Sequence, residues 1–279
     1  MFSKENAKRL SINQSTKFYQ IKIYNYNYFM NTKNYLSRIG IENATISVNS
    51  ANLKFLQKQH LLRVPFENLD IHWKRKIILD TKKFYEKIVE EKRGGFCYEL
   101  NGLFCELLKK LGFTSKIISA RVFDDKDFGA EYDHLAILTK IDEKEFLVDV
   151  GFGEFATEPL EFISGIEQKD ASGIFLIRKF DEDYFEVAKK DGGNWKGEYI
   201  FKDSARDLDE FMEMCSFHQT SIESHFTHGK VCSLLTANGR KSLTDKKFIE
   251  TVNGEKSETE INSEDEFNQI LAREFNVYR

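Results

Sequence analysis

The sequence predicts an α+β fold, because the spacing of its apolar residues changes twice along the chain. Up to about residue 112 apolar residues recur every three or four positions, which is typical of amphipathic helices. Beyond that point they alternate with polar residues, as in half-buried strands, and the last part mixes both patterns. We therefore expect a helical domain at 30–112, a mainly β domain at 113–218 and an α/β domain at 219–279, with an extension of unknown role at 1–29.

The helical part has several expected elements. They begin just after Met30 and continue at 48–62, 81–92 and 97–111. Asp80 precedes the third helix and is a residue type that accepts hydrogen bonds from the free N–H groups of a helix start. The fourth helix is the strongest prediction, because its apolar residues form one stripe at helical spacing and Gly112 follows where helices commonly end.

The β part and the C-terminal part follow from shorter signals. Strands are expected at 114–123, 134–141, 144–152, 173–180 and 183–190, and a helix at 206–217. Near the C-terminus, Asn253-Gly254 is the dipeptide preferred in two-residue hairpin turns. Ser263 and Glu266 have the spacing of a capping box, which predicts a last helix to about residue 274.

Composition excludes several classes of protein. The chain has 279 residues, 41% of them hydrophobic, and a formal net charge of −4, without a long block of one sign. The composition is that of a folded protein, and the sequence has no block of basic residues that would bind nucleic acid or an acidic membrane. We therefore expect a small-molecule partner. Its apolar runs are much shorter than the roughly 18 residues of a membrane span, and residues 1–29 lack the apolar core of a secretory signal. Four cysteines form neither a disulfide framework nor a paired metal motif, which favours free thiols in the cytoplasm.

Cys97 stands at the start of the strongest predicted helix, in the segment Gly94-Gly95-Phe96-Cys97 that leads into it. Free backbone N–H groups and the positive end of the helix dipole meet at this position, which can lower a thiol pKa and favour a nucleophilic thiolate. The alternative is that Cys97 is only a small apolar residue packed at a helix start.

His134 and Asp149 provide a candidate base and a carboxylate that would orient it. In an antiparallel hairpin, a tight turn of even length centred between Ile141 and Asp142 would place these two residues directly opposite each other, with Cβ atoms ~5 Å apart. A histidine opposite an aspartate is often only structural, and a three-residue turn would separate the pair. Together with Cys97, however, they would form a catalytic triad, an arrangement that recurs on unrelated folds.

Four segments of the chain resemble the arylamine N-acetyltransferases in their order and spacing. They are RVPFENLDI (63–71), RGGFCYELNGLF (93–104), HLAI (134–137) and FLVDVGFG (146–153). The resemblance runs from about Met30 to the C-terminus, and it implies a helical bundle, a central antiparallel β-barrel and a C-terminal α/β lid. The short span between Asp149 and Phe226 is similar to that of the compact bacterial members.

The resemblance also implies roles for individual residues. Cys97 would accept the acyl group, His134 would be its base and Asp149 the carboxylate behind it. An acceptor pocket would be lined by Phe66, Phe152 and Phe226, and a Glu67–Arg93 ion pair would brace the nucleophile's turn. The implied reaction is ping-pong transfer of an acetyl group from acetyl-coenzyme A to an arylamine, an arylhydroxylamine or a hydrazine. No metal is implied, and the residues that contact the coenzyme A phosphates cannot be assigned.

Other interpretations use the same residues differently. A cysteine hydrolase or a transglutaminase-like enzyme could use the triad with another acceptor, and a non-catalytic binding protein could keep the fold. Papain-type enzymes are disfavoured, because their histidine lies ~130–150 residues beyond the cysteine, much farther than His134 lies from Cys97. Four residues close in sequence could suggest a metal site, but their spacing fits no tetrahedral motif: Cys215, His218, His225 and His228.

Overall fold

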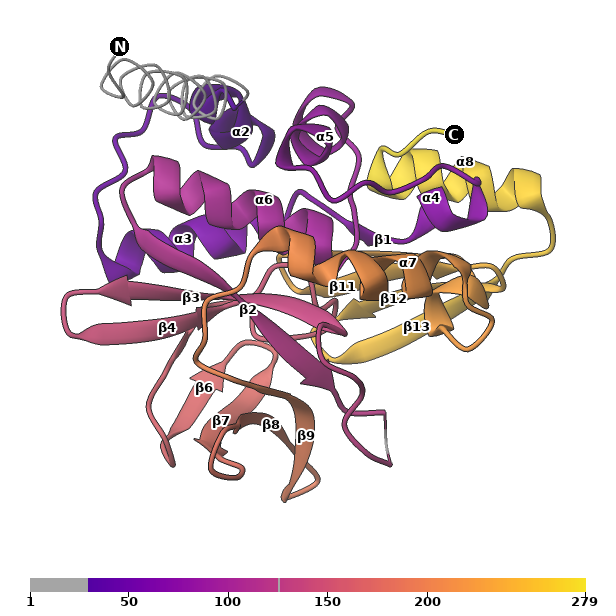
Figure 1. Ribbon diagram of the computed structural model, residues 1–279. Helices are drawn as coiled ribbons and strands as arrows, with labels where there is room; N and C mark the ends of the chain where they lie inside the picture. Colours follow the sequence, from indigo (N-terminus) through magenta and orange to yellow (C-terminus); the bar gives the residue numbers. More distant parts are fainter. Residues whose placement is uncertain (1–29, 125) are drawn as a thin grey trace, which may run out of the picture.

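The computed structural model describes residues 30–124 and 126–279, so the expected extension at 1–29 lies outside the described residues. Figure 1 shows helices of the N-terminal part beside a large sheet, with a second sheet and the last helix at the C-terminal end. This mixture of separate helical and antiparallel parts confirms the α+β prediction. Within the described residues, no helix is long and apolar enough to cross a membrane.

The N-terminal part of the described chain is helical, as the spacing of its apolar residues predicts. Its helices are α2 (Thr32–Arg38), α3 (Ser50–Leu61), α4 (Leu69–His72), α5 (Thr81–Tyr85), the π-helical turn η1 (Glu86–Glu90) and α6 (Cys97–Lys110). The Asp80 carboxylate accepts hydrogen bonds from the first N–H groups of α5, as expected. Gly112 has a φ of +94°, the left-handed conformation that ends a helix without steric cost for glycine.

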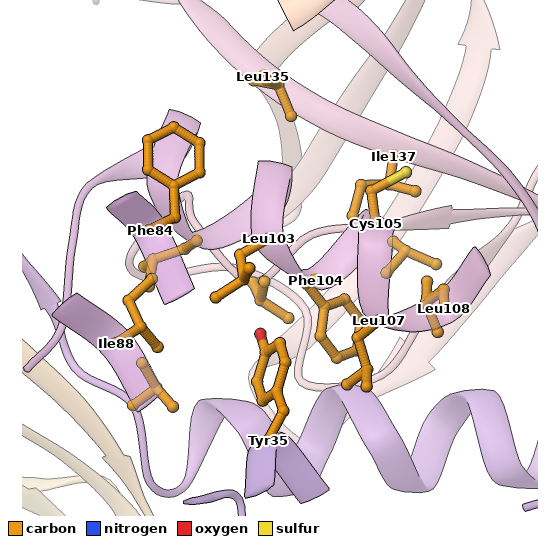
Figure 2. Close-up of a cluster of buried hydrophobic side chains, with 14 of the residues drawn as sticks. Tyr35, Phe84, Ile88, Leu103, Phe104, Cys105, Leu107, Leu108, Leu135 and Ile137 are labelled. Atoms are coloured by element: carbon orange, nitrogen blue, oxygen red, sulfur yellow. The ribbon is translucent and has the colours of Figure 1, made fainter. Parts of the chain in front are cut away.

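Helix α6 forms the centre of the largest hydrophobic core. Its leucines and Phe104 are fully buried, because the helix lies between other helices and the first long strands of the sheet. Figure 2 shows Leu103 and Phe104 between Tyr35 and Ile88 of the helical part and Leu135 of the sheet. Cys105 is part of this packing and is fully buried. The apolar stripe that predicted α6 is therefore in contact with neighbours along its length.

The larger sheet has the order β5-β4-β3-β2-β9-β8-β7-β6, and all its pairs are antiparallel. Its strands are β2 (Thr114–Val122), β3 (His134–Ile141), β4 (Lys144–Val148), β5 (Leu160–Glu161), β6 (Glu167–Asp170), β7 (Gly173–Lys179), β8 (Phe185–Asp191) and β9 (Asn194–Phe201). The two edge strands meet through one side chain: the Gln168 amide accepts from the Glu161 N–H at 2.7 Å and donates to the Glu161 carbonyl at 2.8 Å. These bonds bring the sheet close to a closed barrel.

The turn between β3 and β4 differs from the predicted one. Ile141 pairs with Lys144, so the turn consists of Asp142 and Glu143 and the register is shifted by two residues. Asp142 adopts a φ of +54°, which a tight two-residue hairpin turn requires. The prediction that His134 and Asp149 are directly opposite partners is therefore wrong. The strand expected at 144–152 ends at Val148, and Asp149 lies just beyond the ladder.

The second sheet has the order β1-β10-β11-β12-β13, and it includes a strand from the N-terminal part of the chain. Its strands are β1 (Phe66–Glu67), β10 (Val231–Thr236), β11 (Gly239–Thr244), β12 (Lys247–Val252) and β13 (Glu255–Glu260). Asn253 and Gly254 form the predicted turn, both with positive φ. Ser263 caps α8 (Glu264–Phe275), which packs on one face of this sheet.

A connecting segment joins the two sheets. The helix expected at 206–217 begins as the 3-10 turn η2 (Leu208–Phe211) and continues as α7 (Met212–Thr220). The short turn η3 (His225–Thr227) follows and carries Phe226. Pairing of β1 with β10 then holds the start of the second sheet against the loop that precedes α6.

Candidate active site

The turn before Cys97 is held tightly by strand β1. The Glu67 N–H donates to the Gly95 carbonyl at 2.8 Å, and the Gly95 N–H donates to the Pro65 carbonyl at 3.3 Å. A Cβ atom on Gly94 would lie 2.1 Å from the Pro65 oxygen, closer than any real contact. Only glycine therefore lets the two segments approach so closely, which explains why a glycine precedes the nucleophile's turn.

Cys97 is the first residue of α6 and is only 3% exposed. The Leu135 N–H donates a hydrogen bond to its sulfur, which places the sulfur at the start of β3, next to His134 in the chain. Burial raises the pKa of the thiol well above its usual value; the Leu135 bond lowers it, and the Asp133 and Asp149 carboxylates raise it. The expectation that the helix N-terminus lowers this pKa is therefore wrong, because desolvation outweighs it. Ionisation needs a base that takes the proton.

His134 and Asp149 are in direct contact although their register differs from the predicted one. His134 Nε2 donates to Asp149 Oδ2 over 2.7 Å, and both residues are buried. The contact survives because a shift by two residues leaves both side chains on the same face of the sheet. With Nε2 bound to the carboxylate, Nδ1 is the ring nitrogen that can exchange a proton with the thiol or a substrate.

The Asp149 carboxylate is fixed by three further donors. Gly151 donates its N–H at 2.9 Å, Asn101 its side-chain amide at 2.8 Å and Tyr199 its hydroxyl at 3.3 Å. Burial raises the pKa of Tyr199 far above its usual value, and the neighbouring Asp149 adds to the shift, so this hydroxyl remains a donor. These donors hold the carboxylate in a fixed orientation beside His134.

Asn101 and Tyr199 are site residues that the sequence analysis missed. The Asn101 amide also donates to the Leu135 carbonyl at 2.6 Å and accepts the Val150 N–H at 2.8 Å, so it ties α6 to β3 and to the segment that follows β4. It follows Cys97 by one helical turn, and helical spacing could have placed it on the same face. No local signal marks Tyr199, because its contact depends on how β9 lies in the barrel.

The three phenylalanines of the implied pocket lie on two sides of the site. Phe66 and Phe226 have ring centroids 6.2 Å apart, and Phe226 also meets the buried Phe96 at 5.9 Å. Phe152 instead packs edge-on against His134 at 5.2 Å. All three pocket residues are only half-buried. Partly exposed aromatic rings near a buried thiol suit the binding of a flat apolar molecule.

A buried group of charges lies beneath the nucleophile's turn. Arg93 Nη2 contacts Glu67 at 2.6 Å and Asp70 at 3.0 Å, so the structure brings the implied pair together and adds a second carboxylate. Lys87, which the sequence analysis did not single out, contacts Asp70 at 2.8 Å and Glu99 at 2.9 Å. The Glu99 carboxylate in turn accepts the Phe96 N–H, which caps α6. These charges therefore support the backbone of the turn.

The residues weighed as metal ligands serve other contacts. His218 bonds the Ser224 hydroxyl at 3.1 Å through Nδ1, and its ring meets Phe226 at 5.1 Å. Ser224 caps η3, so His218 helps to position Phe226. In the described part of the chain, no three side chains of the metal-binding types are grouped as a candidate site.

The site thus has a buried thiol, an imidazole held by a carboxylate, free N–H groups at the first turn of α6, and aromatic rings around them. These are the groups that acyl transfer through a thioester requires.

Comparison with known proteins agrees with the chemistry that these groups indicate. The family described as N-acetyltransferase matches residues 50–278. Arylamine N-acetyltransferase, pineal gland isozyme NAT-10, from Gallus gallus is 30% identical over 280 residues, which cover 88% of this chain and 96% of that protein. Arylamine N-acetyltransferase C from Bacillus anthracis has a TM-score of 0.81 at 28% identity, covering 88% of this chain and 97% of that one.

A further solved structure contains a ligand. Mycobacterium marinum arylamine N-acetyltransferase in complex with CoA has a TM-score of 0.81 at 25% identity, and the match covers 88% of this chain and 92% of that one. Because the similarity extends over nearly the whole length in both sequence and fold, the chain belongs to the arylamine N-acetyltransferase family.

Proposed function

We propose that this protein transfers an acetyl group from acetyl-coenzyme A to arylamines, arylhydroxylamines or hydrazines through a thioester on Cys97. The observation that carries the proposal is the contact between His134 and Asp149, next to the Leu135 N–H that binds the Cys97 sulfur. A CoA complex of a relative with the same fold supports the donor, and the names of the relatives support the acceptor.

The first half-reaction acetylates the enzyme. His134 Nδ1 takes the proton of the Cys97 thiol, and the sulfur attacks the carbonyl carbon of the thioester. The resulting oxyanion is stabilised by the first N–H groups of α6, which have no partner inside the helix. The bond to the coenzyme A sulfur then breaks, and His134 returns the proton to this leaving thiolate.

The second half-reaction transfers the acetyl group to the amine. The amine nitrogen attacks the Cys97 thioester, His134 takes a proton from this nitrogen, and the Cys97 sulfur leaves and is reprotonated. Asp149 keeps the Nε2 proton in place, so that the imidazolium formed in each half-reaction faces a carboxylate. Phe66, Phe152 and Phe226 would surround the aromatic ring of the acceptor.

The cellular setting is part of the same proposal. All four cysteines are free, and burial raises the pKa of each thiol. A nucleophilic thiol has to remain reduced, which favours the cytoplasm. The short span from Asp149 to Phe226 supports the compact bacterial type, and the arylamine acceptor named for the relatives supports a role in xenobiotic metabolism.

Mass spectrometry of the intact protein tests the proposal. After mixing with acetyl-coenzyme A, we expect one acetyl adduct that peptide mapping assigns to Cys97, and an arylamine should remove it and appear acetylated. Cys97→Ser should form no thioester, whereas Cys215→Ser, a change at another buried thiol, should still form it. Release of acetate without amine acetylation would instead support the hydrolase alternative, and no adduct at all would refute acyl transfer.

A further inference from the structure

Helix α8 packs on one face of the second sheet, and the opposite face is not covered by this helix. Cys232, Leu243 and Phe248 point toward α8 and form a core with it. Because side chains alternate along a strand, Ser233 and Arg240 point to the opposite face. The register agrees, since Ser233 pairs with Phe66, one of the rings at the candidate active site. The face with Arg240 is thus the face that includes Phe66.

Arg240 is half-buried but has no carboxylate partner. Its Nη1 donates to the Ser233 hydroxyl at 3.0 Å, and among the described residues no carboxylate oxygen lies within ion-pair distance of it. Burial lowers the pKa of the guanidinium, and the attraction of Glu154 raises it. A guanidinium that is partly removed from water, with its nearest counter-charge outside ion-pair distance, is costly unless a ligand supplies a closer negative charge.

The surroundings of Arg240 connect it to the candidate active site. Glu154 lies two residues after Phe152, which packs on His134. The Glu154 carboxylate is 74% exposed and pairs with Lys189 at 3.5 Å, so a second cation stands in the same region. Glu198 is also near Lys189 and Glu154, and burial raises the pKa of its carboxyl to about 7, which leaves it partly protonated at neutral pH. The two cations are therefore only partly balanced.

We propose that Arg240, assisted by Lys189, binds a phosphate group of coenzyme A and so selects the complete coenzyme over shorter thioesters. This inference rests on the proposed function, since it concerns the acyl donor of the same site. The guanidinium fork matches phosphate oxygens in two parallel hydrogen bonds, and Ser233 fixes its direction. The phosphates lie at the far end of the pantetheine arm from the thioester, which agrees with a cation beyond Phe152 rather than beside Cys97.

The test compares two acyl donors with the same thioester. Acetyl-coenzyme A carries phosphates, and S-acetylpantetheine carries none. Arg240→Gln should raise KM for acetyl-coenzyme A by roughly 10- to 100-fold, because charge-assisted hydrogen bonds to phosphate are lost. Its KM for S-acetylpantetheine should stay within about twofold, and kcat should change little, because phosphate binding is equal in the ground state and the transition state. Arg240→Lys should recover part of the affinity.

A matched control is available on the same strand. Lys241→Gln removes one positive charge from the next residue, but Lys241 faces α8, where it pairs with Glu274. This variant should leave the ratio of the two KM values unchanged. An equal rise of both KM values in Arg240→Gln would show a purely structural role and overturn the inference. KM values that are both the same as in the wild type would overturn it as well. If the wild-type protein is acetylated by neither donor, the proposed function itself fails.

Discussion

Replacing Asp149 by asparagine keeps the shape of the side chain but changes one oxygen into a donor. The hydrogen bonds of the carboxylate determine which of its two oxygen positions the NH2 group occupies. Oδ1 accepts hydrogen bonds from Gly151 and Asn101, at 2.9 Å and 2.8 Å, so an NH2 group there would face two donors. The amide of Asp149→Asn must therefore turn its NH2 toward His134.

The consequence for His134 is a change of tautomer. An NH2 group that faces Nε2 donates to this nitrogen, so the ring proton moves to Nδ1, the position that accepts a proton in the proposed reaction. The imidazolium also loses its carboxylate. In the serine protease triad the corresponding change lowers kcat by about 10⁴, and a thiol, which is a better nucleophile than a hydroxyl, should soften the loss. We expect acetylation of Cys97 to be roughly 10²- to 10⁴-fold slower, with the fold intact.

Rapid mixing with acetyl-coenzyme A, followed by detection of released coenzyme A, measures this step directly. Asp133→Asn is the matched control, because Asp133 is a carboxylate near Cys97 that does not bind His134. Removing its charge should not slow acetylation. An Asp149→Asn protein within about threefold of the wild-type rate would show that the contact at 2.7 Å has no part in catalysis.

Three further outcomes follow from the structure. Iodoacetamide should modify Cys97 at least about tenfold faster than the other three cysteines, because in the proposed mechanism His134 takes the proton of this thiol, and His134→Gln should remove the difference. Arg93→Ala should lower the free energy of unfolding by ~3–5 kcal/mol, since Glu67 and Asp70 lose a buried partner, and denaturant unfolding measures it. Burial lowers the pKa of His60 from 6.5 to about 3. The unfolded chain therefore binds this proton first, and stability should fall by about 2 kcal/mol from pH 7 to pH 5, an effect absent in His60→Gln.

Each of these outcomes can be contradicted. Equal labelling of all four cysteines would refute the activated thiol. An Arg93→Ala protein with an unchanged unfolding midpoint would mean that the charges around Glu67 rearrange without cost. Equal pH dependence in wild type and His60→Gln would show that His60 is protonated in the folded protein.

The residues alone are enough to predict most elements and the three side chains proposed as the catalytic triad. The stripe of α6 predicts a buried helix because burial of one face follows directly from spacing. Asp80, Gly112, Asn253-Gly254 and Ser263 act through contacts within a few residues, and all four form the predicted local structure. Cys97, His134 and Asp149 could be named because their residue types are limited to a few kinds of chemistry.

Other features depend on contacts between distant segments. The turn lies at Asp142 and Glu143, so the hairpin register differs by two residues from the predicted one. The sequence could not determine this register, since several tight turns fit it. Burial reversed the expected pKa shift of Cys97, because desolvation depends on everything packed around the sulfur. Tyr199 approaches Asp149 from β9, and Arg240 is turned toward Phe66 only by the pairing of β1, β10 and β11. Local sequence predicts short-range hydrogen bonds and periodic faces, whereas solvent exclusion and contacts between remote strands exist only once the whole chain has packed.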